Sequence, residues 1–416
     1  MVHRPVPHVL ARAVRYYVDS FRDLRREVWL LALITFVNRA GSMVVPFLSL
    51  YLTKDMGLTL EQVGWIMSCF GAGSVVGSWL GGKLSDKLGF YDVMVGALIA
   101  SGLAFIGLQF VRGFAPFCAG VFLLMVLADA FRPGMYVAIR AYARPADRTR
   151  AVSLIRLAIN LGFGLGPAIG GLLIATWSYA GLFWVDGLTS LAAAGILWTA
   201  LPRRQARTDD RGARSTGTRS PYRDGPFLFM LVILVFVGVA FLQYFSTVPI
   251  FYSEVHGLDE RAIGILLGLN GLVIFLTEMP LIKYCGSRGL DPFRILRFSV
   301  WLIALSFVLL YIVPAVAFLW VGILLMTVGE MLNFPFMNRL AYERADKGPP
   351  GAYMALFTIG WSVAHLIGHT AGLDLIAHFG FTITWYFFTG VLLLAVGMLY
   401  LLERMVRKES EVPGTA

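Results

Sequence analysis

Long apolar segments follow one another along nearly the whole chain, each close to the length of about 20 residues that a helix needs to cross a bilayer. Hydrophobic residues make up 58% of the chain and charged residues 14%, against about 45–50% and about 25% in a typical soluble domain. The segments are 28–52, 61–84, 91–111, 115–139, 150–174, 180–201, 226–252, 261–284, 293–312, 315–340, 351–374 and 381–402. They predict an all-α polytopic membrane protein with twelve transmembrane helices.

The stretch after the sixth segment differs in composition, being rich in Arg, Ser, Thr, Gly and Asp, which is typical of a flexible linker. We therefore expect a basic N-terminal segment (1–27), a six-helix bundle (28–201), a linker (202–225), a second six-helix bundle (226–402) and a tail (403–416). The N-terminal segment is too polar for a secretory signal peptide. It is either a solvated tail or an amphipathic helix on the inner leaflet, and such a helix would use Tyr16, Tyr17, Val18 and Phe21.

Lys and Arg predict the orientation, because they are concentrated in cytoplasmic loops. With the N-terminus inside, 29 of the 35 Lys and Arg residues fall on the inner side and three on the outer side. The remaining three lie within spans. The net charge of +10 is therefore explained by topology, and we expect no nucleic-acid partner and both termini in the cytoplasm.

The two halves carry matching features, which indicates a duplication. Gly57-Leu58 follows the first span and Gly257-Leu258 follows the seventh. The fourth span carries Asp129, Pro133 and Tyr142-x-Arg144, and the tenth carries Glu330, Pro335 and Tyr342-x-Arg344. A parallel repeat of this kind predicts two pseudo-symmetric bundles that move about a central site.

Residues 82–94 contain a loop motif, Gly-Lys-Leu-Ser-Asp-Lys-Leu-Gly, between the second and third spans. It resembles the corresponding loop motif of the major facilitator superfamily, with Phe90 and Tyr91 where basic residues are usual. The resemblance implies that Gly82 allows close helix contact and Gly89 a tight turn. It also implies that Asp86, followed by Lys87, meets a helix N-terminus or an arginine and holds the outward-open state.

The fifth span carries a second motif, formed by Gly162, Gly166, Pro167, Gly170 and Gly171. It resembles the motif of the superfamily's multidrug and small-molecule:proton antiporter branch, although a generic small-residue interface would look the same. Small residues let two membrane helices pack closely, which could seal the outer half of a pathway. Phe131-Arg132-Pro133 has some likeness to proton-coupled peptide transporters, but no acid precedes Asn38 and Arg39 in the first span as that branch requires.

A charged side chain at membrane depth costs roughly 2.5–3.5 kcal/mol on insertion scales, so we expect each one to have a function or a partner. A buried carboxylate can bind a proton near neutral pH, so we predict a proton relay, with static pairing as the alternative. The charged candidates are Arg39, Asp129, Arg132, Arg156, Glu278 and Glu330. Arg39 has no acid within one helical turn, so its partner must come from another helix or from a substrate.

Asn38, Asn160, Asn333 and Trp361 lie at similar depth and are candidates for lining a cavity, or for joining helices. His365 and His369 are four residues apart, but no third ligand is near, so we predict no metal site. We also expect no catalytic residues and no cofactor, since the sequence has neither a catalytic constellation nor a nucleotide-binding loop.

The preferred interpretation is a secondary transporter in the bacterial inner membrane that exports small amphipathic molecules in exchange for protons. A proton-coupled importer of peptides or other small solutes is the alternative. In both cases the partners are a small-molecule substrate, protons and the lipid bilayer, and we expect a monomer.

Overall fold

The computed structural model describes residues 21, 23–204, 219–312, 315–348 and 350–411, and the described part contains helices and no strand. Within it, eleven helical segments are long and apolar enough to cross a membrane. Most of the N-terminal segment and the middle of the linker lie outside the described residues, and so do Tyr16, Tyr17 and Val18. Phe21 is described and is buried in a hydrophobic core, which at this residue fits neither a solvated tail nor an amphipathic helix that turns Phe21 toward the leaflet.

The helices keep the predicted order and most lie within a few residues of the predicted bounds. The exception is α15, which covers the last two predicted segments and continues to Glu411, into the predicted tail. Those of the first half are α2 (Arg26–Ala40), α3 (Val44–Leu50), η1 (Tyr51–Asp55), α4 (Leu60–Leu88), α5 (Phe90–Leu108), α6 (Phe114–Asp129), α7 (Phe131–Tyr142), η2 (Pro145–Asp147), α8 (Arg148–Thr176) and α9 (Tyr179–Ala200). Those of the second half are η4 (Pro221–Arg223), α10 (Gly225–Leu242), η5 (Gln243–Phe245), α11 (Thr247–Glu254), α12 (Glu260–Ser287), α13 (Pro292–Ile312), α14 (Ala317–Ala345) and α15 (Pro350–Glu411).

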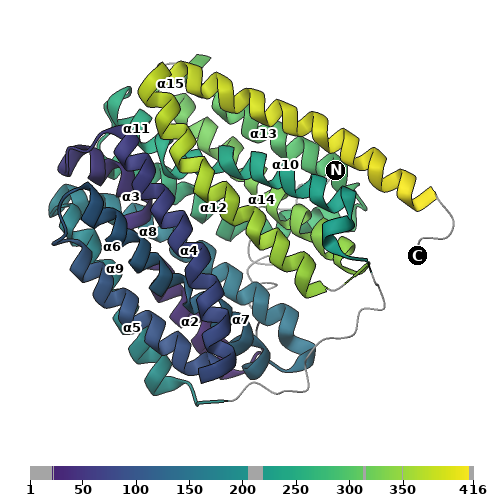
Figure 1. Ribbon diagram of the computed structural model, residues 1–416, viewed down its shortest axis with the longest axis horizontal. Helices are drawn as coiled ribbons and strands as arrows, with labels where there is room; N and C mark the ends of the chain where they lie inside the picture. The colour runs from purple at the N-terminus through teal and green to yellow at the C-terminus, as the bar shows by residue number, and fades with distance from the viewer. Residues whose placement is uncertain (1–20, 22, 205–218, 313–314, 349, 412–416) are drawn as a thin grey trace, which may run out of the picture.

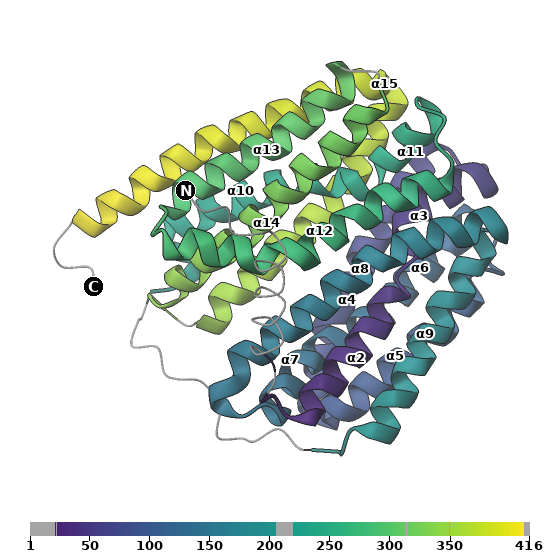
Figure 2. The same ribbon diagram turned by 180° about the vertical axis from the view of Figure 1, so that it is seen from behind.

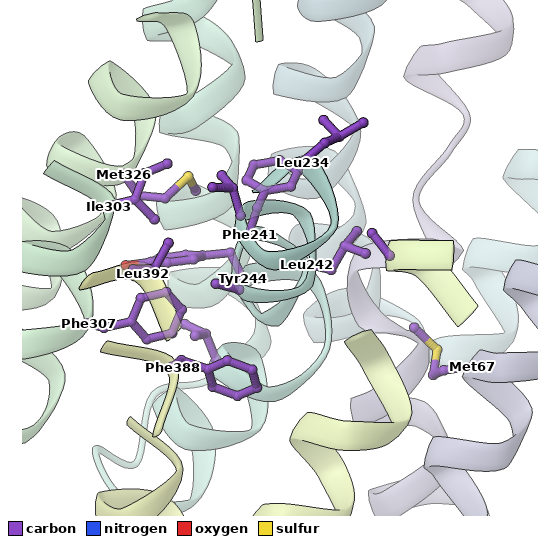
Figure 3. Packing of buried hydrophobic residues seen from close by; sticks show 14 of the residues in the cluster. Met67, Leu234, Phe241, Leu242, Tyr244, Ile303, Phe307, Met326, Phe388 and Leu392 are labelled. Atoms are coloured by element: carbon purple, nitrogen blue, oxygen red, sulfur yellow. The ribbon is translucent and has the colours of Figure 1, made fainter. Parts of the chain in front are cut away.

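The helices of each half lie together, α2 to α9 in purple to teal and α10 to α15 in green to yellow (Figure 1; Figure 2). The halves meet where α8 packs on α12 and α4 packs on α15. The smaller hydrophobic core belongs to the first half, whereas the larger one includes residues of both. Figure 3 shows part of the larger core, where Tyr244 and Phe307 pack with their ring centroids 5.5 Å apart.

Three predicted spans are interrupted, and the interruptions share one cause. The first span breaks between α2 and α3, the fourth between α6 and α7, and the seventh at η5. In each case a proline is the third residue of the following helix: Pro46 in α3, Pro133 in α7 and Pro249 in α11. Proline has no N–H group, so it cannot bond back to the preceding turn and is tolerated in the first turn of a helix. Each of the three interrupted regions still forms one membrane-capable segment, as predicted: Arg26–Asp55, Phe114–Tyr142 and Gly225–Glu254.

Gly380 interrupts α15, the longest helix. Its φ of 75° and ψ of 176° are not helical, so two helical segments of α15 meet there. Glycine adopts a positive φ without the steric cost that a Cβ would bring. Residues 350–379 and 381–411 therefore differ in direction, as the turn of the yellow-green ribbon into yellow shows in Figure 1.

The duplicated glycine-leucine pairs have the same backbone geometry. Gly57 and Gly257 have φ values of 65° and 64°. The amide of Leu58 donates to the carbonyl of Leu52 at 3.0 Å, and the amide of Leu258 donates to that of Tyr252 at 3.1 Å. The sequence match between the halves is thus a match of local structure as well.

Candidate substrate and coupling site

A cavity of about 140 Å³ separates α4 and α7 of the first half from α15 of the second. Its lining residues are Gly71, Ser74, Ser78, Arg132, Thr358, Trp361, Ser362 and His365. On one side of the cavity α4 and α15 touch, since the hydroxyl of Thr370 donates to the carbonyl of Gly64 at 3.0 Å. The loops and helix ends predicted to be cytoplasmic carry most of the described Lys and Arg residues and are here called the basic face.

Asp129 is the buried acid beside this cavity, and the structure brings it together with Arg132. The guanidinium of Arg132 donates to Asp129 Oδ1 at 3.1 Å, and the hydroxyl of Ser74 donates to Oδ2. The Arg132 side chain is 50% exposed while that of Asp129 is 4% exposed. The guanidinium of Arg132 therefore lines the cavity, whereas the carboxylate of Asp129 is buried on the side of Arg132 away from it.

Arg39 lies in the last turn of α2 and is not among the residues that line the cavity. Its charged neighbours are Arg132 and Asp129, and its guanidinium carbon is 5.5 Å from the ring centroid of Phe163. None of the described carboxylates forms an ion pair with it, and no hydrogen bond from its guanidinium occurs among the described residues. The predicted partner on another helix is thus missing from the described part of the chain.

Glu278 on α12 joins the two halves. Arg156 of α8 donates to Glu278 Oε1, and Asn160 of α8 donates to Oε2 at 2.9 Å. Because both donors come from α8, the carboxylate forms a tie between the first and the second half.

Glu330 on α14 lies close to this tie. Asn270 of α12 donates to Glu330 Oε2 at 3.0 Å and also to the hydroxyl of Thr327 at 3.0 Å. Glu278 and Arg156 are charged groups close enough to interact electrostatically with Glu330. Two acids of the second half and one arginine of the first half therefore share one electrostatic environment.

The other polar candidates differ in their surroundings. Trp361 lines the cavity. Asn38 donates to the hydroxyl of Ser190 at 3.4 Å, and the fully buried Asn333 donates to that of Ser299 at 3.0 Å. These two amides join helices within one half, so the expectation that Asn333 lines a cavity does not fit its position.

The histidine pair is not part of a larger ligand cluster. The rings of His365 and His369 are 5.7 Å apart between centroids. Among the described residues, no group of three His, Cys, Asp or Glu side chains is placed to hold a metal ion.

Asp186 is a buried acid that the sequence analysis missed. It lies on α9 and accepts hydrogen bonds from the amides of Met43 (2.9 and 3.1 Å) and Val44 (2.9 Å), at the break between α2 and α3. A carboxylate at a helix N-terminus satisfies amides that have no partner within the helix. The sequence feature that could have revealed it is a single acid inside the sixth apolar segment. In the structure this acid stabilises the break that follows α2, the helix that carries Arg39.

The glycines of the fifth span form two contact surfaces. A Cβ built at Gly164 or Gly171 would lie within 3 Å of α12 backbone, and one built at Gly264 would lie 2.4 Å from the carbonyl oxygen of Pro167. The predicted close packing of this motif is therefore present between α8 and α12. On the other side, Gly162 and Gly166 face α2, and Gly170 faces Met43.

The loop motif behaves as predicted at one glycine and not at the other. Gly89 has a φ of 92°, as a tight turn requires. A Cβ at Gly82 would meet nothing within 4 Å, so the prediction of close contact there is wrong. Its neighbour Gly81 makes that contact, at 2.4 Å from the carbonyl oxygen of Ala130. Asp86 and Lys87 are exposed, and neither forms an ion pair with a described residue.

Two further clusters of polar side chains, one around Glu260 and one around Arg344, connect the ends of different helices. On the face opposite the basic one, Lys54 and Tyr179 of the first half donate to Glu260 of α12, at 2.7 and 2.9 Å. On the basic face, the buried Arg344 of α14 pairs with Asp224, which precedes α10, and with Glu409 near the end of α15.

The sequence signature of the Major Facilitator Superfamily matches residues 28–369. The chain belongs to this superfamily. It is therefore a multi-pass membrane transporter and not an enzyme, and the bacterial relatives below point to the inner membrane.

Several superfamily members cover nearly the whole chain. The uncharacterized MFS-type transporter YqjV of Bacillus subtilis is 23% identical over 404 residues, which are 94% of this chain and 97% of that protein. Multidrug resistance protein 1 of the same organism is 24% identical over 387 residues, 90% and 95% of the two chains. Among solved structures, a POT family transporter in complex with 5-aminolevulinic acid has a TM-score of 0.75 at 14% identity, covering 92% of this chain and 96% of its own. That likeness shows the fold alone.

Proposed function

We propose that this superfamily member is a proton-coupled exporter of small amphipathic molecules that works by alternating access. In this proposal α15 crosses the membrane twice, on either side of Gly380, which gives twelve spans in two bundles (28–201 and 226–402). The basic face is cytoplasmic and both termini lie there. The 1–27 segment, the 202–225 linker and the 403–416 tail are then cytoplasmic as well.

The observation that carries the proposal is the tie between Glu278 and the two α8 donors, Arg156 and Asn160. Its strength depends on the charge of the carboxylate, because a hydrogen bond to an ionised group is roughly twice as strong as a neutral one. Binding of a proton by Glu278 would weaken a contact that holds the halves together. The chain thus offers a physical link between protonation and movement of one half against the other.

Asp129 and Glu330 are the proposed companions of Glu278 in proton transfer. Asp129 borders the cavity next to Arg132, and Glu330 shares the surroundings of Glu278. A cargo that binds at Arg132 would compete with Asp129 for the guanidinium, which couples cargo and proton in the first half. The similarity to multidrug resistance protein 1 favours export over import.

The test uses proteoliposomes with an imposed inward proton gradient and fluorescent amphipathic dyes of either charge. Dye that leaves the vesicles against its own gradient supports exchange, whereas dye or peptide that accumulates with the protons supports the importer alternative. We expect Asp129→Asn, Glu278→Gln and Glu330→Gln each to abolish gradient-driven transport and to leave counterflow intact. Glu343→Gln, at an exposed pair on α14, is the matched control. Full gradient-driven transport in all three variants would refute the relay.

A further inference from the structure

Arg39 carries a charge that no described protein group neutralises. A charge at membrane depth is costly unless it is paired, and an arginine without a partner there points to a ligand or to water. Arg132 and Asp129 are its charged neighbours, and neither is hydrogen-bonded to it. The face of Phe163 gives it a cation–π contact at 5.5 Å, which leaves the charge itself in place.

Asp129 is hydrogen-bonded to other groups and not to Arg39. Its Oδ1 already accepts from Arg132 and its Oδ2 from Ser74. The three groups Arg39, Arg132 and Asp129 therefore sum to one positive charge. Since half of the Arg132 side chain is exposed, this charge is directed to the cavity that Arg132 lines.

The opposite wall of the cavity, on α15, combines one large aromatic side chain with smaller polar ones: Trp361 with Thr358, Ser362 and His365. Trp361 packs edge to face against Phe334, with ring centroids 4.8 Å apart. Phe334 packs in the same way against Phe241, also at 4.8 Å, so rings behind the indole hold it in place. A fixed aromatic side chain opposite a cationic one suits a molecule with an apolar ring system and one negative group.

We propose, building on the transport function above, that the cargo is an amphipathic anion. Its carboxylate, sulfonate or phosphate binds between Arg39 and Arg132, and its apolar body packs against Trp361. Arginine suits this role because its planar guanidinium binds such oxyanions in a bidentate manner. The arrangement disfavours a cationic cargo, which would have to approach two guanidinium groups with the nearest acid already bonded.

A structural alternative for Arg39 is that it complements the carbonyl end of α2, since it lies in the last turn of that helix. That role would make Arg39 important for folding but indifferent to the charge of a ligand. The two roles are therefore separated by comparing ligands of different charge on the same protein.

The experiment measures binding to the full chain in nanodiscs of zwitterionic lipid, without a proton gradient, by thermal unfolding and tryptophan fluorescence. Three probes share a naphthalene body: 1-naphthylacetate, the neutral 1-naphthylacetamide and the cationic 1-naphthylmethylammonium. We expect only the anion to raise the unfolding temperature. Arg39→Gln should weaken its binding at least tenfold and Arg39→Lys less. Arg112→Gln, at an arginine with 62% side-chain exposure on the opposite face, should bind as the wild type.

Asp129→Asn is a second variant that distinguishes loss of binding from loss of folding. Removal of the competing acid should tighten binding of the anion, whereas a folding defect would weaken it. Preference for the cation, or anion binding that is unchanged in Arg39→Gln, would overturn the proposal, and so would absence of anion binding to the wild type. Nanodiscs that contain phosphatidylglycerol show the source of the anion: an Arg39-dependent stabilisation by this lipid alone assigns the site to a lipid headgroup. Because binding is measured without a gradient, its outcome is independent of whether transport is proton-coupled.

Discussion

The glycine-lined contact between α8 and α12, here called the seam, gives the sharpest prediction. It is tested by the substitution Gly264→Ala. The added Cβ would lie 2.4 Å from the carbonyl oxygen of Pro167, whereas ordinary contact begins at 3.4 Å, so the helices must separate by about 1 Å. Backbone cannot rotate aside as a side chain can. Overpacking of a tight contact costs about 1–3 kcal/mol.

That cost applies only to the state in which the seam is closed. A difference of about 1–3 kcal/mol shifts a two-state equilibrium about 5- to 150-fold. An opened state populated at about 1% would then rise to between about 5% and 60%. The matched control is Gly286→Ala in the same helix, where a Cβ meets nothing within 4 Å.

The assay is a spin-label distance measurement between Glu61 at the start of α4 and Arg261 at the start of α12, both exposed and in different halves. Cys69, Cys118 and Cys285 are first replaced, and labelled cysteines are placed at the two positions. We expect a longer-distance population in Gly264→Ala and the wild-type distribution in Gly286→Ala. Identical distributions in both variants would show that the glycine seam does not hold this end closed.

Three further predictions concern polar ties. Asp186→Asn should lower the thermal unfolding midpoint, because hydrogen bonds to a charged group contribute about 1.5–3 kcal/mol each and the amide keeps one acceptor oxygen in place of two. Arg344→Gln should destabilise the protein by about 3–5 kcal/mol in denaturant titrations, since it leaves the buried Asp224 without its ion pair, while Arg339→Gln at an exposed pair on the same helix should cost less than about 1 kcal/mol. Lys54→Met should lengthen the same spin-label distance less than Gly264→Ala does, and Glu260→Gln in addition to it should lengthen it further, because the neutral amide also weakens the hydrogen bond that Tyr179 donates; an unchanged distance in both variants would contradict a role for these ties.

Much of the fold was readable from the sequence because membrane spans depend on length and apolarity. The segments, their order and the glycine-rich packing of the fifth span follow from composition and spacing alone. The breaks at Pro46, Pro133 and Pro249 were not predicted. A proline in a membrane helix is compatible with a kink, a break or a continuous helix, as Pro167, Pro280 and Pro335 inside helices demonstrate. Which of these occurs depends on partners elsewhere, such as Asp186 at the first break.

The candidate site was predictable residue by residue but not in its pairing. Apolar context singled out Arg39, Asp129, Arg156, Glu278 and Glu330. Only Asp129 and Arg132, three residues apart on neighbouring helical turns, could be paired from spacing. The partnership of Arg156 with Glu278 spans 122 residues of sequence and depends on how the halves dock.

The contacts between the halves differ in kind from those within them, and this bears on how the transporter could move. Within the second half, large rings such as Trp385 and Phe307 interlock, so separating its helices would expose apolar surface and cost packing energy. Between the halves, α8 and α12 meet through glycine backbone, and α4 and α15 meet through hydroxyl groups such as that of Thr370. At these two places the helices can separate with little loss of side-chain packing, although the larger hydrophobic core also joins the halves. Their closure then depends on a few charged ties, such as the one between Arg156 and Glu278. In the mechanism proposed above, a proton weakens this tie and a cargo neutralises the unpaired charge of Arg39. A transporter built in this way needs only about 1–3 kcal/mol from proton or cargo to change which state prevails.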